Sequence, residues 1–240
     1  MKTLHPHHRE ILGELRKKVK ADQVPLGKDG FRYVGTTKPV YFLRAADLRK
    51  LYKDFAKRHP DLTADELVAL LDSLSHGKTY NEFVGIGLLL NEYPKLRETL
   101  DPRCLDRWLE RAEGWAEVDV ICQLNYTSRE MLTDWESWKT LLTAFAKDEN
   151  VHKRRAGLVL LTKPLRESDD PRLADLAFSN VDRLKTEKNI LITKAVSWIL
   201  RSLIKHHRTA VSNYLDANGS GLPKIVVRET RHKLVKGVKR

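Results

Sequence analysis

The segment TADELVALLDSLSH, from Thr63 to His76, places its apolar residues at the three- and four-residue intervals of an α-helix. Thr63 and Glu66 form the pattern of a capping box, which marks the start of a helix. The same periodicity recurs in segments 43–59, 80–93, 102–114, 135–148, 152–165, 171–184, 189–207 and 208–218. No segment shows the alternation typical of a strand. The sequence therefore predicts an all-α protein of about a dozen helices.

Further start signals and one irregular stretch divide the chain. Asp101-Pro102, Thr133 and Asp170-Pro171 are each expected to open a helix. The stretch from Gln23 to Tyr41 is rich in Gly, Pro and Thr, and we expect it to be non-helical. We predict a single α-helical repeat domain over 1–240, in which 1–42 form an N-terminal helix and connecting loop and 43–240 form the helical repeats.

Short connections between helices favour antiparallel pairs, which can pack as a bundle or as a solenoid. Trp115, Arg155 and Trp198 occupy comparable helix positions 40 and 43 residues apart. These intervals match the ~40–47-residue period of HEAT-type repeats. We therefore predict a HEAT-like repeat solenoid that carries the three side chains on one concave face.

The positive charge of the chain is concentrated in its last part. The 240 residues carry a net charge of +12, and residues 151–240 hold 20 Lys+Arg against 8 Asp+Glu, whereas residues 1–150 hold 24 of each. Such asymmetry is typical of a protein that binds a polyanion, most often nucleic acid. The alternative is a solvated basic face that promotes solubility.

The sequence gives little sign of a membrane, a disulfide or a zinc site. No run approaches the ~20 apolar residues of a membrane span, and the charged N-terminus does not resemble a signal peptide. We expect a cytoplasmic protein. Cys104 and Cys122 lack metal-ligand spacing and are interpreted as small core residues. The motif HPHH near the N-terminus is interpreted as an exposed helix start, because no metal-ligating partner stands at suitable spacing.

The segment AEGWAEVDVICQLNY, from Ala112 to Tyr126, places a carboxylate in an apolar helix. Trp115 and Asp119 are four residues apart and share one helix face. Glu117 is rotated by ~200° from Asp119, so these two acids do not form a glycosidase carboxylate pair. Burying the charge of an aspartate costs free energy, so we expect either a partner that compensates the charge or a function that uses it. Trp115 is then either a core anchor or a functional aromatic residue, and Asp119 either an ion-pair partner of an arginine or a catalytic group.

Several motifs together resemble the AlkD-like family of bacterial DNA alkylation repair glycosylases. They are EGWAEVD, DENVHKRRAGLVLL, ITKAVSWILR, YVGTTKPVYFLRAADLRKL and VVRETRHKL, and they cover the chain from about Phe31 onward. The resemblance implies a HEAT-like solenoid that excises N3- and N7-alkylated purines without a metal or organic cofactor. It implies that Asp119, Trp115 and Trp198 are catalytic and that Arg155 contacts the DNA backbone. One departure is Gly114-Trp115, where the family often has two adjacent aromatic residues.

The implied reaction gives Asp119 and the tryptophans a physical role. Alkylation at N3 or N7 makes the purine cationic and hence a good leaving group. The sugar then develops oxocarbenium character, which a carboxylate and indole faces stabilise, and Asp119 can position the attacking water. Most glycosylases flip the base into a pocket, whereas the resemblance implies that the lesion nucleotide is held by its sugar and phosphates.

Basic residues are expected to contact DNA phosphates. The expected partner is double-stranded DNA containing alkylated purines, bound by a monomer and without a membrane. The candidate contacts lie on the later helices and the basic tail, and are Lys153, Arg154, Arg155, Lys194, Arg201, Lys205, Arg208, Arg228 and Arg231.

Three functions remain in competition at this point. The first is a cofactor-independent, monofunctional alkylpurine DNA glycosylase that hydrolyses the N-glycosidic bond. The second is a non-catalytic HEAT-repeat protein that recognises DNA shape or damage. The third is a solenoid scaffold for acidic proteins. Trp115 and Asp119 favour the first, because a protein that only binds a polyanion has no need of a carboxylate in its basic wall.

Overall fold

The computed structural model describes residues 4–19, 34–123 and 125–237. The elements in these ranges are all α-helices, and no strand occurs among the residues described, so the all-α prediction is confirmed. By their internal contacts, the residues fall into two compact units, Met1–Ile121 and Cys122–Arg240, which are treated one at a time below. The prediction of a single repeat domain stays a prediction.

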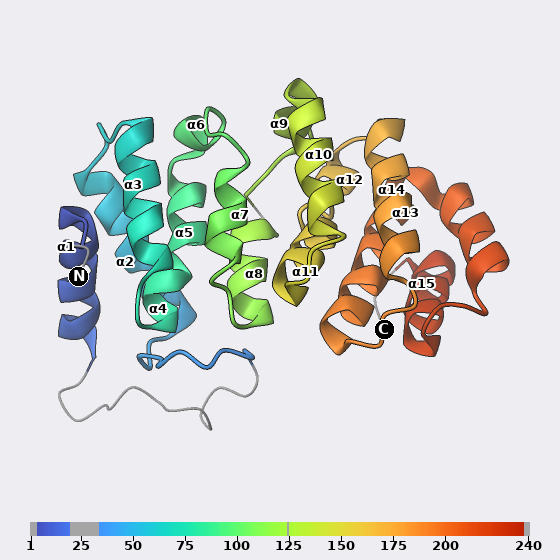
Figure 1. Cartoon of the computed structure of the whole chain (residues 1–240), viewed down its shortest axis with the longest axis horizontal. Helices are drawn as coiled ribbons and strands as arrows, with labels where there is room; N and C mark the ends of the chain where they lie inside the picture. The colour runs from blue at the N-terminus through green and yellow to red at the C-terminus, as the bar shows by residue number, and fades with distance from the viewer. Residues whose placement is uncertain (1–3, 20–33, 124, 238–240) are drawn as a thin grey trace. The chain divides into compact units, whose positions relative to one another are not determined.

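The first unit stacks its helices in chain order, from blue to green in Figure 1. α1 packs on α2, α3 and α4, α2 packs on α5, and α3 packs on α5, α6 and α7. This succession of neighbours is consistent with a helical repeat. The helices are α1 (Pro6–Lys18), α2 (Ala45–Arg58), α3 (Ala64–Ser75), α4 (Tyr80–Phe83), α5 (Gly85–Glu92), α6 (Pro94–Arg97), α7 (Cys104–Leu109) and α8 (Trp115–Cys122), the last of which ends at the boundary of the unit.

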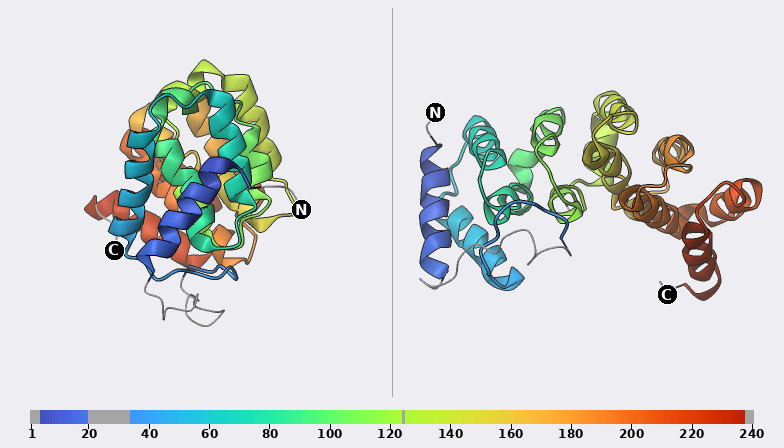
Figure 2. Two further views of the ribbon diagram at one scale, coloured as in Figure 1. Left: turned by 90° about the vertical axis from the view of Figure 1, so that its left-hand side faces the viewer. Right: turned by 60° about the horizontal axis from the view of Figure 1, so that its bottom comes forward.

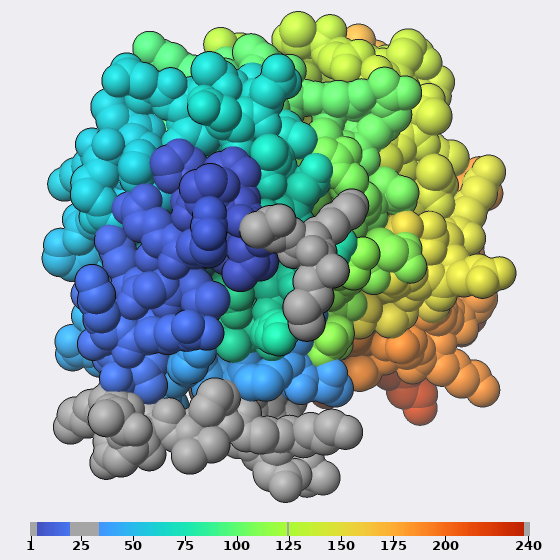
Figure 3. Space-filling model, turned by 60° about the vertical axis from the view of Figure 1, so that its left-hand side comes forward, coloured from blue at the N-terminus to red at the C-terminus, as the bar shows by residue number. Residues whose placement is uncertain are grey.

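Apolar stripes hold these helices together. α2 buries Leu48, Leu51, Tyr52 and Phe55 at the spacing of one helix face. α1 lies along the surface at one end of the unit, in dark blue in Figure 3, and buries Ile11. This packing holds α1 on the unit, although residues 19–44 separate it from α2 in the chain.

The second unit is organised around its longest helix. α14 packs on α11, α12, α13 and α15, and α10 packs on α9, α11 and α13. The right-hand view of Figure 2 shows the helices of this unit following one another, from yellow-green to red. The helices are α9 (Ser128–Thr133), α10 (Trp135–Phe145), α11 (Val151–Val159), α12 (Pro164–Glu167), α13 (Pro171–Leu184), α14 (Ile190–Asn218) and α15 (Lys224–Lys236).

Several predicted boundaries are confirmed. The capping box of Thr63 and Glu66 is present, and Asp170 caps α13 with Pro171 at its first position. α13 has the predicted range 171–184. α14 contains a kink at His207, whose φ of −123° and ψ of 42° are non-helical. This kink falls where the sequence pattern separates segments 189–207 and 208–218.

Two predicted helix starts are wrong. Thr133 is the last residue of α9, and its hydroxyl donates to the carbonyl oxygen of Arg129 at 2.8 Å. The start signal belongs to Thr127, whose capping box opens α9, and α10 follows after Asp134. Asp101 caps a turn, accepting from the backbone N–H of Arg103 at 2.9 Å, and α7 begins only at Cys104.

Segment 152–165 is not one helix as predicted. α11 ends at Val159 and α12 begins at Pro164. Proline lacks a backbone N–H, and its ring clashes with the carbonyl group four residues earlier, so a helix cannot continue through this position without a kink. Segment 80–93 is likewise divided into α4 and α5 at Val84, whose backbone remains in the helical region.

One further expectation needs correction. The HPHH motif is not a wholly exposed helix start, because His8 is fully buried between Ser73 and Glu82. The basic tail from Lys224, for which no helix was predicted, forms α15 and buries Val226 against the unit. Of the predicted connecting stretch 23–41, residues 23–33 lie outside the described residues.

Cys104 and Cys122 are both buried, as expected for small core residues. Among the helices that the structure describes, none is both long enough and apolar enough to cross a membrane.

Candidate functional site

α8 carries the two candidate residues of the first unit. Trp115 is its first residue and is half-buried, and Asp119 follows one turn later with 8% of its surface exposed. Val118 and Ile121, between and after them, are completely buried and fix the helix in the core. The indole and the carboxylate therefore share one face of a helix that cannot easily rotate.

Glu117 has a different environment from Asp119. Its side chain is fully enclosed. Its carboxylate accepts hydrogen bonds from the Thr36 hydroxyl at 2.8 Å, the Lys38 ammonium at 3.2 Å and the Glu113 backbone N–H at 2.6 Å. This agrees with the prediction that Glu117 and Asp119 point to different sides of the helix. Glu117 is thus a structural carboxylate whose charge is compensated by Lys38.

Residues 34–38, which we call the strap, cross the start of α8. Gly35 has a φ of +74°, and a Cβ placed on it would lie 3.3 Å from Cδ1 of Trp115. A Cβ on Gly114 would lie 2.5 Å from the carbonyl oxygen of Val34 and 2.7 Å from the backbone nitrogen of Thr36. A side chain at position 114 would therefore collide with the strap backbone. The strap occupies the space beside Trp115, which explains why glycine stands where a second aromatic residue was expected.

Lys38 fastens the strap. Its ammonium donates to the carbonyl oxygen of Arg111 at 2.8 Å, lies 3.4 Å from Oε1 of Glu113, and sits 4.4 Å from the ring centre of Phe83. Burial opposes ionisation of Glu113, but hydrogen bonds from Thr37 and the charge of Lys38 outweigh this effect and lower the pKa of Glu113. The strap thereby joins α8 through charged hydrogen bonds.

Tyr80 is a neighbour that the sequence did not reveal. Burial raises the pKa of Tyr80 to about 12, with further contributions from the negative charges of Glu117 and Asp119. Its phenol therefore stays protonated at neutral pH. Its backbone N–H donates to the carbonyl oxygen of Pro39 at 2.9 Å, next to the strap. No spacing in the sequence connects Tyr80 with α8, so only the fold could identify it.

In the second unit, Trp198 lies on α14 and is half-buried. Lys194, Arg201 and Lys205 stand four residues before, three after and seven after it, so all four share one helix face. Lys194 and Lys205 are exposed, whereas Arg201 is buried. This face of α14 combines an accessible indole edge with positive charge.

Arg155 connects two helices of the second unit. It is 4% exposed, and its Nη1 donates to the carbonyl oxygen of Leu191, in the first turn of α14, at 2.7 Å. Its predicted role as a contact to the DNA backbone stays a prediction. Trp115 and Asp119 belong to one unit and Arg155 and Trp198 to the other. Their placement on one concave wall stays a prediction.

The other candidate phosphate contacts fall into two groups. Arg154 is held by both oxygens of Glu187, at 3.0 and 2.8 Å, and Lys153 is buried with its Nζ 3.6 Å from Asp148. By contrast, Lys194 and Arg228 are exposed, and neither has an ion-pair partner among the described residues. The remaining candidates make protein contacts, namely Arg201 with Glu229 at 3.5 Å, Lys205 with the Arg166 carbonyl oxygen at 2.5 Å, Arg208 with the Leu234 carbonyl oxygen and Arg231 with Asp216 at 3.4 Å.

Positive side chains from three helices gather in this unit. Burial lowers the pKa of Lys233 on α15, and the charges of Arg201 on α14 and Arg166 on α12 lower it further. Burial also lowers the pKa of Arg201, although Glu229 opposes the shift. Like charges held near one another create a positive potential that favours an anionic partner.

The comparisons with known proteins bear on this arrangement. A search of curated proteins finds no match. The chain does match the family described as DNA alkylation repair enzyme, over residues 14–234. The matched region spans most of both units and includes Trp115, Asp119, Arg155 and Trp198. With a match of this extent on an all-α fold, the chain belongs to the DNA alkylation repair enzyme family.

Proposed function

We propose that the protein is a monofunctional DNA glycosylase that releases N3- and N7-alkylated purines from double-stranded DNA. Membership of the DNA alkylation repair enzyme family supports a role in alkylation repair with DNA as the substrate. The observation that carries the finer proposal is the division of roles between the two acids of α8. Glu117 is fully enclosed and tied to Lys38, whereas Asp119 lies on the face of the half-buried Trp115.

The chemistry follows from the charge of the substrate. The alkylated purine is cationic while attached to the sugar, so it takes the electron pair of the N-glycosidic bond and leaves as a neutral base, with little need for a general acid. Asp119 stabilises the positive charge that develops on the sugar and positions the attacking water. Trp115 presents its electron-rich face to the same sugar. This hydrolysis requires no metal or organic cofactor, because the leaving group already carries the positive charge.

The second unit supplies the remaining parts of the proposal. Trp198 provides the second indole, and Arg155 contacts a phosphate near the lesion. Exposed cations such as Lys194 and Arg228 bind the DNA backbone and supply affinity without sequence specificity. We propose that the protein acts as a monomer in the bacterial cytosol or nucleoid.

The deciding experiment replaces Asp119 by asparagine and follows release of 7-methylguanine from duplex DNA under single-turnover conditions. Asn keeps the shape and removes the charge, so release should slow by roughly 10²–10³. Affinity for undamaged DNA should hold or rise, because an anion has left a surface that faces phosphates. Trp198→Ala should also slow release, through loss of an indole rather than of a charge.

Glu117→Gln is the matched control on the same helix. It removes the charge that Lys38 compensates and should lower the melting temperature. A parent protein that binds DNA but releases no alkylated base would favour the non-catalytic DNA-binding function. An Asp119→Asn variant that loses roughly 3–5 kcal/mol of stability would instead identify Asp119 as an ion-pair partner.

A further inference from the structure

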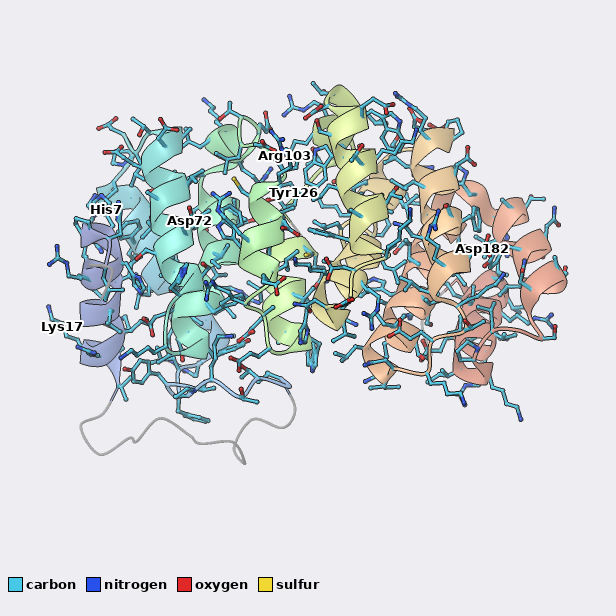
Figure 4. The ribbon with its side chains drawn as sticks, in the orientation of Figure 1. His7, Lys17, Asp72, Arg103, Tyr126 and Asp182 are labelled. Atoms are coloured by element: carbon cyan, nitrogen blue, oxygen red, sulfur yellow. The ribbon has the colours of Figure 1, made fainter. Side chains whose placement is uncertain are left out.

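The proposed function leaves the HPHH motif unexplained, although the structure brings a fourth histidine, His59, to it. His7 lies in the first turn of α1, near the end opposite Lys17 in Figure 4. His59 is the residue that follows the last turn of α2, and it comes to the same place from 52 positions away. Glu10 stands between them: its Oε2 lies 2.9 Å from Nε2 of His59 and 3.5 Å from Nδ1 of His7.

These distances resemble the edges of a metal coordination sphere. Zinc–ligand bonds of ~2.0–2.1 Å in a tetrahedron place neighbouring ligand atoms about 3.3–3.4 Å apart. The three ligand atoms of His7, Glu10 and His59 all lie within 4.8 Å of one another. Small rotations of the two rings would therefore bring all three onto one ion without movement of the helices.

The surroundings hold the carboxylate in a suitable orientation. Nη2 of Arg58 donates to Oε1 of Glu10 at 3.0 Å, which leaves Oε2 directed at the two imidazoles. The same guanidinium also pairs with Glu14, so two acids balance its positive charge.

The two imidazoles are also packed in place. Their ring centres are 4.3 Å apart, and the ring of Phe55 lies 4.5 Å from His59 and 5.5 Å from His7. All three ligand side chains are half-buried, with 26–33% of their surface exposed, so solvent can reach the fourth position. His8 takes no part, because Ser73 and Glu82 occupy both of its ring nitrogens.

We propose that His7 Nδ1, Glu10 Oε2 and His59 Nε2 form a binding site for a divalent transition-metal ion, with zinc the best match. Two imidazoles and one carboxylate are a ligand set that zinc accepts, with a water in the fourth position. The ion would connect the start of α1 to the end of α2. It would stabilise the folded first unit, because the unfolded chain does not hold the three ligands together.

The test uses the full chain, freed of metal by a chelator and titrated with Co²⁺ and then with Zn²⁺. We expect one equivalent of Co²⁺ to give the visible absorption of a tetrahedral site, Zn²⁺ to abolish it, and the melting temperature to rise with Zn²⁺. His7→Gln, Glu10→Gln and His59→Gln should each weaken Zn²⁺ binding at least about tenfold. His232→Gln, on α15, is the matched control and should bind like the parent.

A melting curve of each metal-free variant shows whether it folds. Of the three variants, His7→Gln should disturb the fold least, because it leaves the end of α2 unchanged. A parent that binds no more tightly than the Glu10→Gln and His59→Gln variants would overturn the proposal. So would binding that is lost in His5→Gln but kept in His59→Gln, since the ion would then sit on the HPHH motif alone. Base release by the metal-free protein tests the glycosylase proposal separately, because the two do not depend on each other.

Discussion

Individual basic residues in the second unit differ in what they can offer to DNA. Arg154 is bound by both oxygens of Glu187, whereas Lys194 is exposed on the face of Trp198. A phosphate that recruited Arg154 would leave Glu187 without its partner. We therefore expect Lys194→Gln to flatten the slope of log affinity against log salt by about 0.9, the effect of one phosphate contact, and Arg154→Gln to leave it unchanged.

Fluorescence titrations of undamaged duplex at several salt concentrations measure this difference, and Arg228→Gln provides a second exposed position. The Arg154 variant should instead unfold at a lower denaturant concentration, since Glu187 loses its partner. Equal slopes for the Lys194 variant and the parent would show that this cation does not contact DNA.

For individual residues, the sequence could predict which face of a helix a side chain lies on, but not which distant residue it pairs with. Helical rotation separated Asp119 from Glu117 correctly, because both lie on one helix. It could not predict that Glu117 pairs with Lys38, which is 79 residues away in the chain. His8 shows the same limit, as its partners Ser73 and Glu82 are 65 and 74 residues distant and make a nominally polar helix start part of the core.

Among the elements, α8 depends on the strap. Lys38 is 9% exposed and Glu117 is fully buried, so Lys38→Met would leave a carboxylate enclosed without its cation. We expect the free energy of unfolding to fall by roughly 3–5 kcal/mol, as for other broken buried pairs. Urea unfolding measures this loss. If the glycosylase proposal holds, release of 7-methylguanine should slow as well, because Trp115 lies against the strap.

Lys50→Met is the matched control for this prediction. Lys50 pairs with Asp54 at 2.7 Å on α2, but its side chain is 68% exposed. Exposed pairs of this kind contribute little to stability, because water screens the two charges. If Lys38→Met and Lys50→Met lost similar amounts of unfolding free energy, burial of the Lys38–Glu117 pair would not add to its contribution to stability.

Periodicity predicted helices well and their interruptions less well. α13 has its predicted range because Asp170 and Pro171 give an unambiguous start. Pro164 lies inside an apolar run and divides segment 152–165 into two helices. The spacing of the apolar residues alone did not indicate this division. α15 was missed because its basic residues dominate the tail, although Val226 marks its buried side.

For the whole molecule, acid should be destabilising. Burial disfavours the ionised form of Glu82, but hydrogen bonds from His8 and Thr79 outweigh it and lower its pKa. Glu10 and Glu113 also have lowered pKa values. A carboxyl whose pKa is depressed in the folded state stabilises the protein above its unfolded pKa, about 4.3 for glutamate, and that contribution is lost as the pH falls through the folded value.

Urea unfolding between pH 7 and pH 3 should therefore show stability falling once the pH drops below about 4.3. Glu82→Gln, which cannot ionise, should be less stable at pH 7 and should show a weaker dependence on acid. A Glu82→Gln profile parallel to that of the parent would show that this carboxyl does not contribute.

Charge is also distributed unevenly over the whole molecule. Residues 122–240, the second unit, hold 23 Lys+Arg and 13 Asp+Glu, whereas residues 1–121 hold 21 and 19. The sequence alone predicted this asymmetry, because charge can be counted without a fold. It could not predict how much of the charge is engaged in the protein, as Arg154 and Arg201 show.

The strap also determines where the protein can be shortened. Helical repeats suggest a boundary at residue 43, and a chain starting there would keep α2 through α15 intact. It would nevertheless lack Thr36 and Lys38, and Glu117 would be enclosed without either side chain. Truncation at an apparently harmless loop would thus act like a mutation deep inside α8. The minimal folded repair protein must therefore begin before the strap, whatever the helix boundaries suggest.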